Sequence, residues 1–300
     1  MAAAAVAAIL VGAAMVATRF VIDQTDPASL ALLRYVIGSL CLLPPVLMAR
    51  RVRVARRDVV PIALLGIAQF GILIALLNFG LQSVGAALGA LIFATFPLLT
   101  MVLAAALRIE ALTALKTAGV ALTVAGVALA LGEKLGAFGE KLALPGAAHE
   151  GWIGEIAIFA SALTGAVCTV LYRPYLRAYP PLQVSAFAMA ASVAFLAALA
   201  AWEGFFAAIA RFTTGGWLAV LFIGMSSGLG YYLWLWALKH TTPTQVTVFL
   251  ALSPITATAL GAAFLSERIS VPFIVGLCCV ALGLWLAHRP GRPGRPGHMA

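Results

Sequence analysis

The segment from Ala90 to Ala130 reads ALIFATFPLLTMVLAAALRIEALTALKTAGVALTVAGVALA, and it decides the fold of this 300-residue chain. It contains two long apolar runs, joined by a short polar stretch around Arg108 and Glu110, and the first run contains a proline. An apolar run of about 20 residues is long enough to cross the hydrocarbon core of a bilayer as an α-helix. The segment therefore predicts two successive transmembrane helices.

The same pattern recurs in the second half of the chain. The segment from Val248 to Ala287 reads VFLALSPITATALGAAFLSERISVPFIVGLCCVALGLWLA and aligns with the first, without a gap, at an offset of 157 residues. Alanine matches carry little weight in such an alanine-rich chain, so the rarer residue types decide. These matches indicate an internal duplication, and they are Pro97 with Pro254, Glu110 with Glu267, Gly119 with Gly276, and Gly126 with Gly283.

Composition extends the membrane prediction to the whole chain. Of its residues, 63% are hydrophobic and 10% are charged, and the mean hydropathy is +1.07. Soluble domains carry about 25% charged residues, so lipid must solvate much of this surface. Ten runs are long enough to span a bilayer, namely 2–22, 28–49, 59–80, 83–107, 112–132, 152–173, 180–201, 213–237, 242–264 and 270–288.

The duplication predicts how these spans are arranged. Each half holds five helices, and because five is odd, the second half must enter the membrane upside down relative to the first. We therefore expect an all-α membrane protein with ten transmembrane helices in two inverted five-helix repeats. The expected organisation is a first repeat at 1–132, a periplasmic connector at 133–151, a second repeat at 152–288 and a cytoplasmic tail at 289–300.

The basic residues favour one orientation. With a cytoplasmic N-terminus, the cytoplasmic side receives 13 of the 19 basic residues but, of the ten acidic residues, only Asp58 and Glu110. Cytoplasmic loops are the ones enriched in Lys and Arg, so we expect a multi-pass protein of the bacterial inner membrane with both termini in the cytoplasm. The 13 residues are Arg50, Arg51, Arg53, Arg56, Arg57, Arg108, Lys116, Arg173, Arg177, Lys239, Arg289, Arg292 and Arg295.

The two quoted segments resemble the drug/metabolite transporter superfamily and, within it, the ten-helix EamA-type exporters. The shared pattern is a helix-internal proline, an apolar run, a glutamate at its end and a glycine-rich helix after it, and the resemblance covers essentially the whole chain. It implies alternating access, with helices one to four and six to nine around a central cavity and helices five and ten at the periphery. It also implies export of small metabolites, with amino acids favoured and aromatic or large apolar ones first.

Other classes of function find little support in the sequence. It has no P-loop, no HExxH motif, no zinc-binding Cys or His spacing, and no single basic face for nucleic acid. We therefore expect no enzymatic activity, no cofactor, no metal site and no nucleic-acid partner. The expected partners are the lipid bilayer and a small-molecule substrate, and a monomer is compatible with the sequence. A passive channel or a non-transporting membrane scaffold is the alternative function.

Polar and aromatic residues of the third and eighth spans are the first candidates for substrate binding. An amide such as that of Asn78 is costly in lipid, so it should face a cavity or, as the alternative, bond to another helix. Tyr231 lies 157 residues after Ile74, one helical turn from Asn78, and together with Trp234 it can wall an amphipathic site. The candidate set is completed by Phe93, Ser253, Tyr172 and Met15.

Two repeat-related prolines are candidate hinges. Pro97 and Pro254 lie well inside their spans, and each disturbs the carbonyl four residues earlier, at Phe93 and Leu250. A carbonyl freed inside the membrane must be satisfied by protein or by water in a cavity. We therefore expect a hinge beside the transport pathway, with a simple packing kink as the alternative.

Charged residues within or beside the spans give three further expectations. Arg19 and Arg34 lie inside helices near the predicted outer ends, and either snorkelling to the headgroups or pairing with a nearby aspartate or a substrate carboxylate explains them. Glu110 and Glu267 fall at helix ends beside arginines, where we expect interfacial ion pairs. No Asp or Glu lies near the middle of a span, which argues against ion coupling through a carboxylate.

Overall fold

The computed structural model describes residues 2–49, 54–109, 113–130, 152–202, 204–205, 212–242, 246, 248–267 and 269–288. Within these ranges every regular element is helical. Seven helical stretches are long and apolar enough to cross a membrane, and three shorter apolar helices accompany them. Together they account for the ten predicted spans. The expected connector at 133–151, the tail at 289–300 and Glu110 lie outside the described residues.

Each repeat contributes five spans, some of which are interrupted. The first repeat consists of α1 (Ala2–Val21) with the 3₁₀ turn η1 (Ile22–Gln24), α2 (Pro27–Met48), α3 (Arg56–Gly66) continued by the π-helical η2 (Ile67–Ile72) and α4 (Leu73–Leu81), α5 (Ala86–Phe93) with α6 (Phe96–Ala106), and α7 (Ala114–Ala130). The second consists of α9 (Ile153–Ala178), α10 (Pro181–Trp202), α12 (Thr214–His240), the 3₁₀ turn η4 (Val248–Ala251) with α14 (Leu252–Leu265), and α15 (Val271–His288).

Local chemistry explains where several of these helices begin. Pro27 and Pro181 are the first residues of α2 and α10, where proline is tolerated because N–H groups of the first turn have no partner within the helix. At the start of α12, the hydroxyl of Thr213 accepts a hydrogen bond from the backbone N–H of Gly216 at 3.0 Å. This side-chain cap satisfies one of the donors that a helix N-terminus leaves unpaired.

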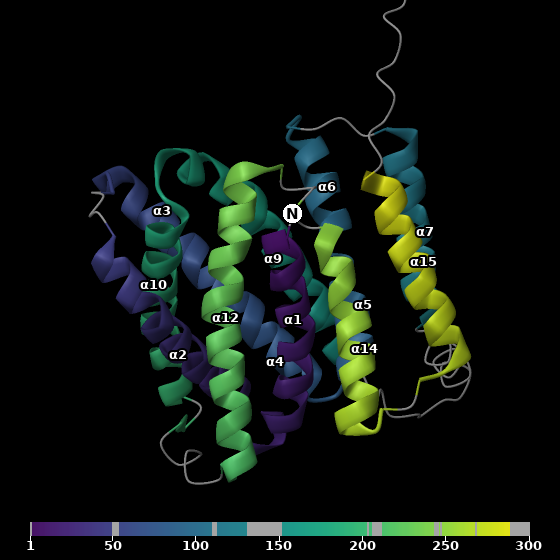
Figure 1. The fold of residues 1–300 in the computed structure, drawn as a ribbon, viewed down its shortest axis with the longest axis horizontal. Coiled ribbons are helices and arrows are strands. Elements are labelled where there is room, and N and C mark those ends of the chain that lie inside the picture. Colours follow the sequence, from purple (N-terminus) through teal and green to yellow (C-terminus); the bar gives the residue numbers. More distant parts are fainter. Residues whose placement is uncertain are drawn as a thin grey trace, which may run out of the picture.

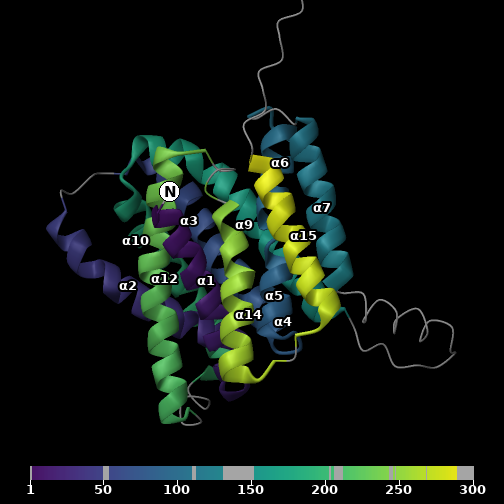
Figure 2. The same cartoon turned by 45° about the vertical axis from the view of Figure 1, so that its right-hand side comes forward.

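The helix contacts follow the inverted repeat (Figures 1 and 2). α1 packs against α12 and α14, and its counterpart α9 packs in the same way against α4 and α6. Likewise, α2 contacts α12 as α10 contacts α3 and η2. The corresponding pairs α2 and α10, and α7 and α15, touch each other directly, and the fourth and ninth spans touch through α5 and α14. A two-fold axis between the repeats produces this pattern.

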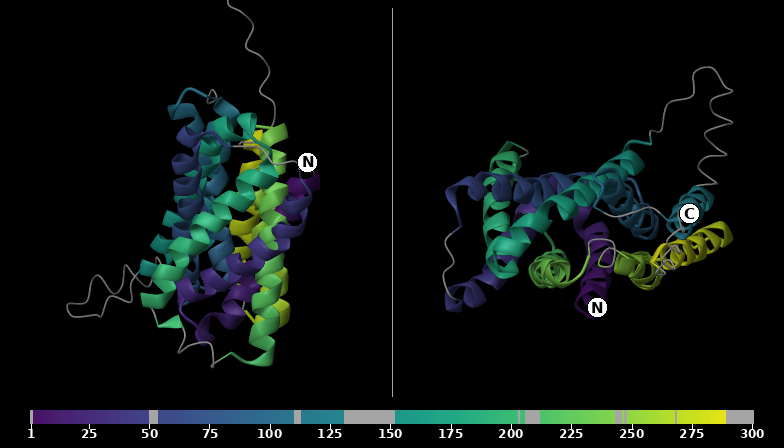
Figure 3. Two further views of the ribbon diagram at one scale, coloured as in Figure 1. Left: turned by 90° about the vertical axis from the view of Figure 1, so that its left-hand side faces the viewer. Right: turned by 90° about the horizontal axis from the view of Figure 1, so that it is seen from above.

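The contact between α7 and α15, at one edge of the bundle (Figures 1 and 3), repeats the symmetry at atomic detail. A Cβ atom added to Gly126 would lie 2.6 Å from the carbonyl oxygen of Gly276, and one added to Gly283 would lie 2.6 Å from that of Gly119. The repeat exchanges these two contacts, because Gly126 corresponds to Gly283 and Gly276 to Gly119. Small residues allow such close approach of transmembrane helices.

Both candidate hinge prolines lie where a helix is interrupted. Ala94 and Thr95 separate α5 from α6, and Pro97 is the second residue of α6. In the second repeat, the 3₁₀ turn η4 gives way to α-helix at Leu252, two residues before Pro254. Proline cannot donate a hydrogen bond to the preceding turn, so each repeat has a weakened point at the place where a hinge is expected.

Glu267 has a role that the sequence analysis did not anticipate, whereas its expected ion-pair partner, Arg268, lies outside the described residues. Its carboxylate accepts hydrogen bonds from the backbone N–H groups of Ala86 at 2.7 Å and Ala87 at 3.0 Å, and so caps the start of α5. Ser266, with φ of 53°, turns the chain back after α14 and brings the carboxylate to this position. An anion is favoured at a helix N-terminus, so Glu267 joins the end of the ninth span to the beginning of the fourth.

Candidate functional site

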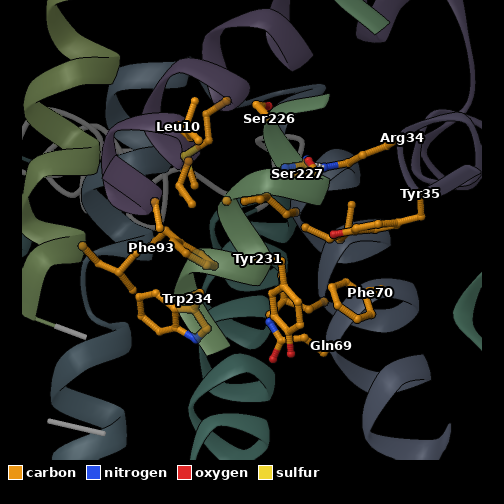
Figure 4. Close-up of a pocket in the computed structure, with 18 of the residues that line it drawn as sticks. Leu10, Arg34, Tyr35, Gln69, Phe70, Phe93, Ser226, Ser227, Tyr231 and Trp234 are labelled. Atoms are coloured by element: carbon orange, nitrogen blue, oxygen red, sulfur yellow. Dashed lines mark hydrogen bonds between the residues drawn. The ribbon is translucent and has the colours of Figure 1, made fainter. Parts of the chain in front are cut away.

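A cavity of about 100 Å³ lies at the interface of the two repeats (Figure 4). A single water needs roughly 10–15 Å³ of such space, so the cavity can admit a solute. Its walls come from α1, α2, the third and fourth spans, α12 and η4. Substrate sites of transporters with inverted repeats lie at this kind of interface, near the bilayer midplane.

Aromatic side chains cover much of the cavity wall. Phe70 makes edge-to-face contacts with Tyr35 and Tyr231, at centroid distances of 4.8 and 4.3 Å. Phe96 contacts Phe93 at 5.6 Å and Trp234 at 6.0 Å, the latter also edge-to-face, which gives a second aromatic group. Aromatic pairs in these arrangements are favourable beyond the area they bury, so the wall is both apolar and fixed in shape.

Arg34 is the one cation among the residues that line the cavity. It is 7% exposed, and its Nε donates a hydrogen bond to the hydroxyl of Ser227 at 2.5 Å. The guanidinium carbon also lies 5.8 Å from the centroid of the Tyr35 ring. Among the described residues, the ion pairs are Arg19 with Asp23 and Arg57 with Asp58. Arg34 is therefore buried without a carboxylate from the described chain, and this burial rules out snorkelling.

The two arginines that looked alike in the sequence thus differ in the structure. Arg19 lies 3.6 Å from the Asp23 carboxylate, and its side chain is 30% exposed. A partly exposed pair of this kind is worth little to stability. Arg34 points instead toward Ser227 across the cavity (Figure 4). Of the two arginines, only Arg34 lines the cavity.

Four of the predicted binding residues line the cavity. Tyr231 and Trp234 project from α12, Phe93 comes from the end of α5, and Met15 comes from α1. Figure 4 shows Trp234 beside Phe93, and Tyr231 beside Phe70. Residues from both repeats therefore meet at one site, although Phe93 and Tyr231 are 138 residues apart in the sequence (231 − 93) and Met15 and Tyr231 are farther apart still.

Asn78 lies outside this cavity. It is fully buried, and its Nδ2 donates a hydrogen bond to the carbonyl oxygen of Pro27 at 2.9 Å, which ties α4 to the start of α2. The helix-to-helix hydrogen bond, which we weighed as the alternative, is therefore what the structure contains. The reason is that Pro27 begins α2 beside this turn of α4, so the amide finds a partner without a cavity.

Ser253 and Tyr172 are also buried away from the cavity lining. Ser253 lies against α1, since a Cβ atom on Gly12 would collide with the Ser253 carbonyl oxygen. The hydroxyl of Tyr172 lies close to that of Tyr231, but neither makes a well-directed hydrogen bond. Tyr172 thus supports the back of Tyr231 rather than the cavity surface.

The cavity is also lined by residues that the sequence interpretation missed, most of them polar. Gln69 and Phe70 lie in the π-helical turn η2, and Ser226 and Ser227 lie midway along α12. Both serine hydroxyls donate to the carbonyl oxygen of Ile223, at 3.0 and 2.6 Å. Gln69 could have been found by the reasoning applied to Asn78, because it is an amide inside an apolar span. π-helical turns recur at functional sites.

The sixth and seventh spans do not contribute to the cavity as expected. None of its lining residues comes from α9 or α10. α9 packs behind α4 and α6, and α10 packs behind α2, α3 and η2. The first repeat therefore supplies four spans to the wall, and the second supplies only its eighth and ninth.

The cavity lining combines one cation with hydroxyls, one amide and aromatic rings, and it contains no Asp, Glu, His or Cys. Across the described part of the chain, no group of three or more His, Cys, Asp or Glu side chains could hold a metal ion. The arrangement is suited to binding an amphipathic solute with a negatively charged group.

Comparisons with known proteins agree with this architecture. The EamA-like transporter family matches residues 1–132 and 152–289. A crystal structure described only as that of a protein superposes with a TM-score of 0.69 at 21% identity, over 95% of each chain, which shows the same fold. No curated protein matches the sequence. With most of its length covered by the two family matches, the chain belongs to the EamA-like transporter family.

Proposed function

We propose that this membrane transporter exports small amphipathic metabolites that carry a carboxylate, with amino acids favoured and aromatic or large apolar ones first. The observation that carries the proposal is Arg34, a buried guanidinium that faces an aromatic cavity without a carboxylate partner among the described residues. A membrane transporter of small molecules is what the family implies. The cavity supports the finer choice of substrate.

The charge of Arg34 supports a carboxylate as the group that it binds. A buried ion is costly unless it is paired and hydrogen-bonded. The bond to Ser227 uses the Nε hydrogen of Arg34, and a guanidinium has four further N–H donors on its terminal nitrogens. These donors form a planar fork that matches the two oxygens of a carboxylate.

The aromatic wall supports an apolar body for the substrate. Trp234 and Tyr231 lie on α12 in successive turns, and Phe93 and Phe70 face them from the first repeat. Rings of this kind gain about 0.5–1.5 kcal/mol from stacking with another aromatic group. The site therefore favours tyrosine, phenylalanine or a large aliphatic amino acid over alanine or glycine.

Alternating access would move the substrate past this site. The inverted repeats give two states of similar architecture, and the interruptions at Pro97 and Pro254 supply a point of bending in each repeat. A passive channel would show flux without saturation or counterflow, and a scaffold would show no flux. Accelerated counterflow in proteoliposomes separates the transporter from both alternatives.

The absence of carboxylates and histidines from the cavity lining supports facilitated transport without proton coupling. Efflux down a substrate gradient should therefore continue when a protonophore collapses the proton gradient. Loss of downhill flux under this condition alone would contradict the proposal.

The positive-inside pattern supports an inner-membrane location with both termini in the cytoplasm. Arg57 and Asp23 have well-exposed side chains, 89% and 77%. Arg57 belongs to the start of α3 and Asp23 to the turn after α1, and the start of α3 and the end of α1 lie at opposite ends of the helix bundle (Figure 1). In cells, Arg57→Cys should react with an impermeant maleimide only after the membrane is opened, and Asp23→Cys should react without opening. Labelling of both from one side would disprove this topology.

A substrate series tests the carboxylate directly. Phenylalanine, 3-phenylpropionate and phenethylamine share a ring and a two-carbon link, but phenethylamine lacks the carboxylate. We expect the first two to compete for counterflow of labelled phenylalanine, and phenethylamine not to compete. Hydrogen bonds to charged groups contribute about 1.5–3 kcal/mol, so Arg34→Gln should weaken the apparent affinity for phenylalanine by roughly 10- to 150-fold.

Arg19→Gln is the matched control. It removes the same charge from the preceding helix, α1, but from a residue outside the cavity lining. Its affinity for phenylalanine should stay within about twofold of the wild type, since exposed ion pairs contribute little. If Arg34→Gln folds and transports phenylalanine as well as Arg19→Gln does, Arg34 does not bind the substrate.

A further inference from the structure

A second pocket, separate from the transport cavity, lies between the C-terminal ends of α9 and α12. Its volume is about 380 Å³, and its lining includes Arg173 and Arg177 from α9 and Lys239 and His240 from α12. No acidic residue lines it; the remaining positions are two leucines and two threonines. Three permanent cations and an imidazole therefore face a space large enough for a polar group.

The repeat shows that this concentration of charge is specific to one end of the molecule. At an offset of 154 residues, Arg173 corresponds to Arg19 and Arg177 to Asp23. In the first repeat these positions form the Arg19–Asp23 ion pair, with 3.6 Å between the charged atoms. In the second repeat an arginine replaces the aspartate, so the counterion is lost.

Two general tendencies place basic residues here, but they do not account for the pocket. Cytoplasmic ends of spans are enriched in Lys and Arg, and cations are favoured in the last turn of a helix. Both tendencies set the depth of the residues along the membrane normal. Neither one requires basic residues of two helices to face a common cavity with no acidic residue in its lining.

The surroundings of the pocket indicate that its opening meets lipid. The ring of Trp236, one turn before His240 on α12, lies against the imidazole at a centroid distance of 4.4 Å, tilted by 35°, and Trp236 is 41% exposed. Tryptophan is enriched where headgroups meet acyl chains. An acyl chain could therefore lie along Trp236 while a headgroup occupies the pocket.

We propose that this pocket binds a phosphate group, that of an anionic phospholipid headgroup or of a soluble phosphate. Arginine binds phosphate through two parallel hydrogen bonds, and Arg173 and Arg177 are one turn apart on the same face of α9. Lys239 and His240 close the pocket from α12. The proposal does not depend on the transported substrate.

Quenching of Trp236 fluorescence tests the proposal on the full-length protein in nanodiscs. Phosphatidylglycerol with brominated acyl chains is titrated into phosphatidylcholine, and the Trp236 signal is the difference between the wild type and Trp236→Phe. We expect saturable quenching by the brominated phosphatidylglycerol. Each basic residue near a membrane surface strengthens binding of anionic lipid by about fivefold, so Arg173→Gln and Arg177→Gln should each raise the half-saturating lipid fraction by about that factor.

Arg56→Gln and Arg108→Gln are the matched controls, because both residues are exposed, carry the same charge and lie outside the pocket. They should leave the half-saturating fraction unchanged. If millimolar inorganic phosphate at constant ionic strength relieves the quenching, the pocket accepts soluble phosphate as well. Equal loss in pocket and control variants, or equal quenching by brominated phosphatidylcholine, would show a general surface charge and overturn the proposal.

Discussion

The contact between α7 and α15 and the cavity lined by Arg34, Tyr231 and Trp234 lie in the same bundle, but the internal repeat is preserved at the first and broken at the second. At the contact, repeat-related glycines make repeat-related approaches, Gly126 to Gly276 and Gly283 to Gly119. At the cavity, the counterparts of Tyr231 and Trp234 at the 157-residue offset are Ile74 and Leu77. Arg34 has an alanine as its counterpart at either the 154- or the 157-residue offset.

The difference follows from what each region has to contact. When two repeat-related helices pack across a two-fold axis, each one contacts a surface equivalent to its own. The same small residues therefore suit both helices. A solute with a charged end and an apolar body has no such symmetry. The residues that we propose to bind it are therefore expected to differ between the repeats, and in the cavity lining the cation comes from the first repeat while Tyr231 and Trp234 come from the second.

The largest effect should come from filling the symmetric contact. Gly126→Leu and Gly283→Leu each force a side chain against a backbone carbonyl that cannot move aside. Overpacking costs about 1–3 kcal/mol, and we expect both variants to melt at lower temperature in detergent, by matching amounts. Gly215→Leu is the control, because the nearest atom to an added Cβ there is 3.6 Å away. If the melting temperatures of Gly126→Leu and Gly283→Leu fall by different amounts, the two halves of the contact do not contribute equally to stability.

Removal of the Glu267 cap should have the next largest effect. Loss of a helix cap costs about 0.5–2 kcal/mol, and Glu267→Ala leaves the N–H groups of Ala86 and Ala87 without their carboxylate. We expect a lower melting temperature that Glu267→Gln, which keeps one acceptor oxygen, partly restores. If alanine and glutamine melt alike, the carboxylate bonds do not stabilise the junction between the fourth and ninth spans.

Truncation of Trp234 should show whether the two repeats contribute differently to binding in the cavity. Stacking adds about 0.5–1.5 kcal/mol, so Trp234→Ala should weaken the apparent affinity for phenylalanine by roughly 2- to 13-fold more than that for leucine. Leu77→Ala, at the repeat-related position in the same cavity, should affect the two substrates equally. Competition counterflow measures both ratios. Equal ratios for the two variants would mean that the repeats are interchangeable in binding.

Asn78 should give the smallest effect, and on stability rather than on transport. It too lacks a polar counterpart, since Leu235 occupies the related position, but it bonds to Pro27 outside the cavity. A neutral hydrogen bond contributes about 0.5–1.5 kcal/mol, so Asn78→Ala should melt earlier and keep its affinity for phenylalanine. A weaker affinity for phenylalanine at an unchanged melting temperature would show that Asn78 belongs to the binding site.

The sequence by itself determined the membrane class, the ten spans and the inverted repeat. These follow from properties that accumulate along the chain, namely the length of apolar runs, the parity of five helices and the residue matches around Pro97 and Pro254. They need no knowledge of which helix touches which. The aromatic residues of α12 could also be predicted as candidates, because a cluster of aromatic residues within one span can be recognised without knowing which helices contact it.

Only the tertiary structure decided which polar groups face the cavity. Arg19 and Arg34 have the same setting in the sequence, yet one pairs with Asp23 and the other bonds to Ser227, which lies 193 residues away. Asn78 is hydrogen-bonded to Pro27, and Glu267 to the start of α5, and both bonds join spans that are distant in the sequence. A polar side chain is costly to bury without a partner, and the partner that it meets is fixed by how helices from the two repeats pack, which no single helix encodes.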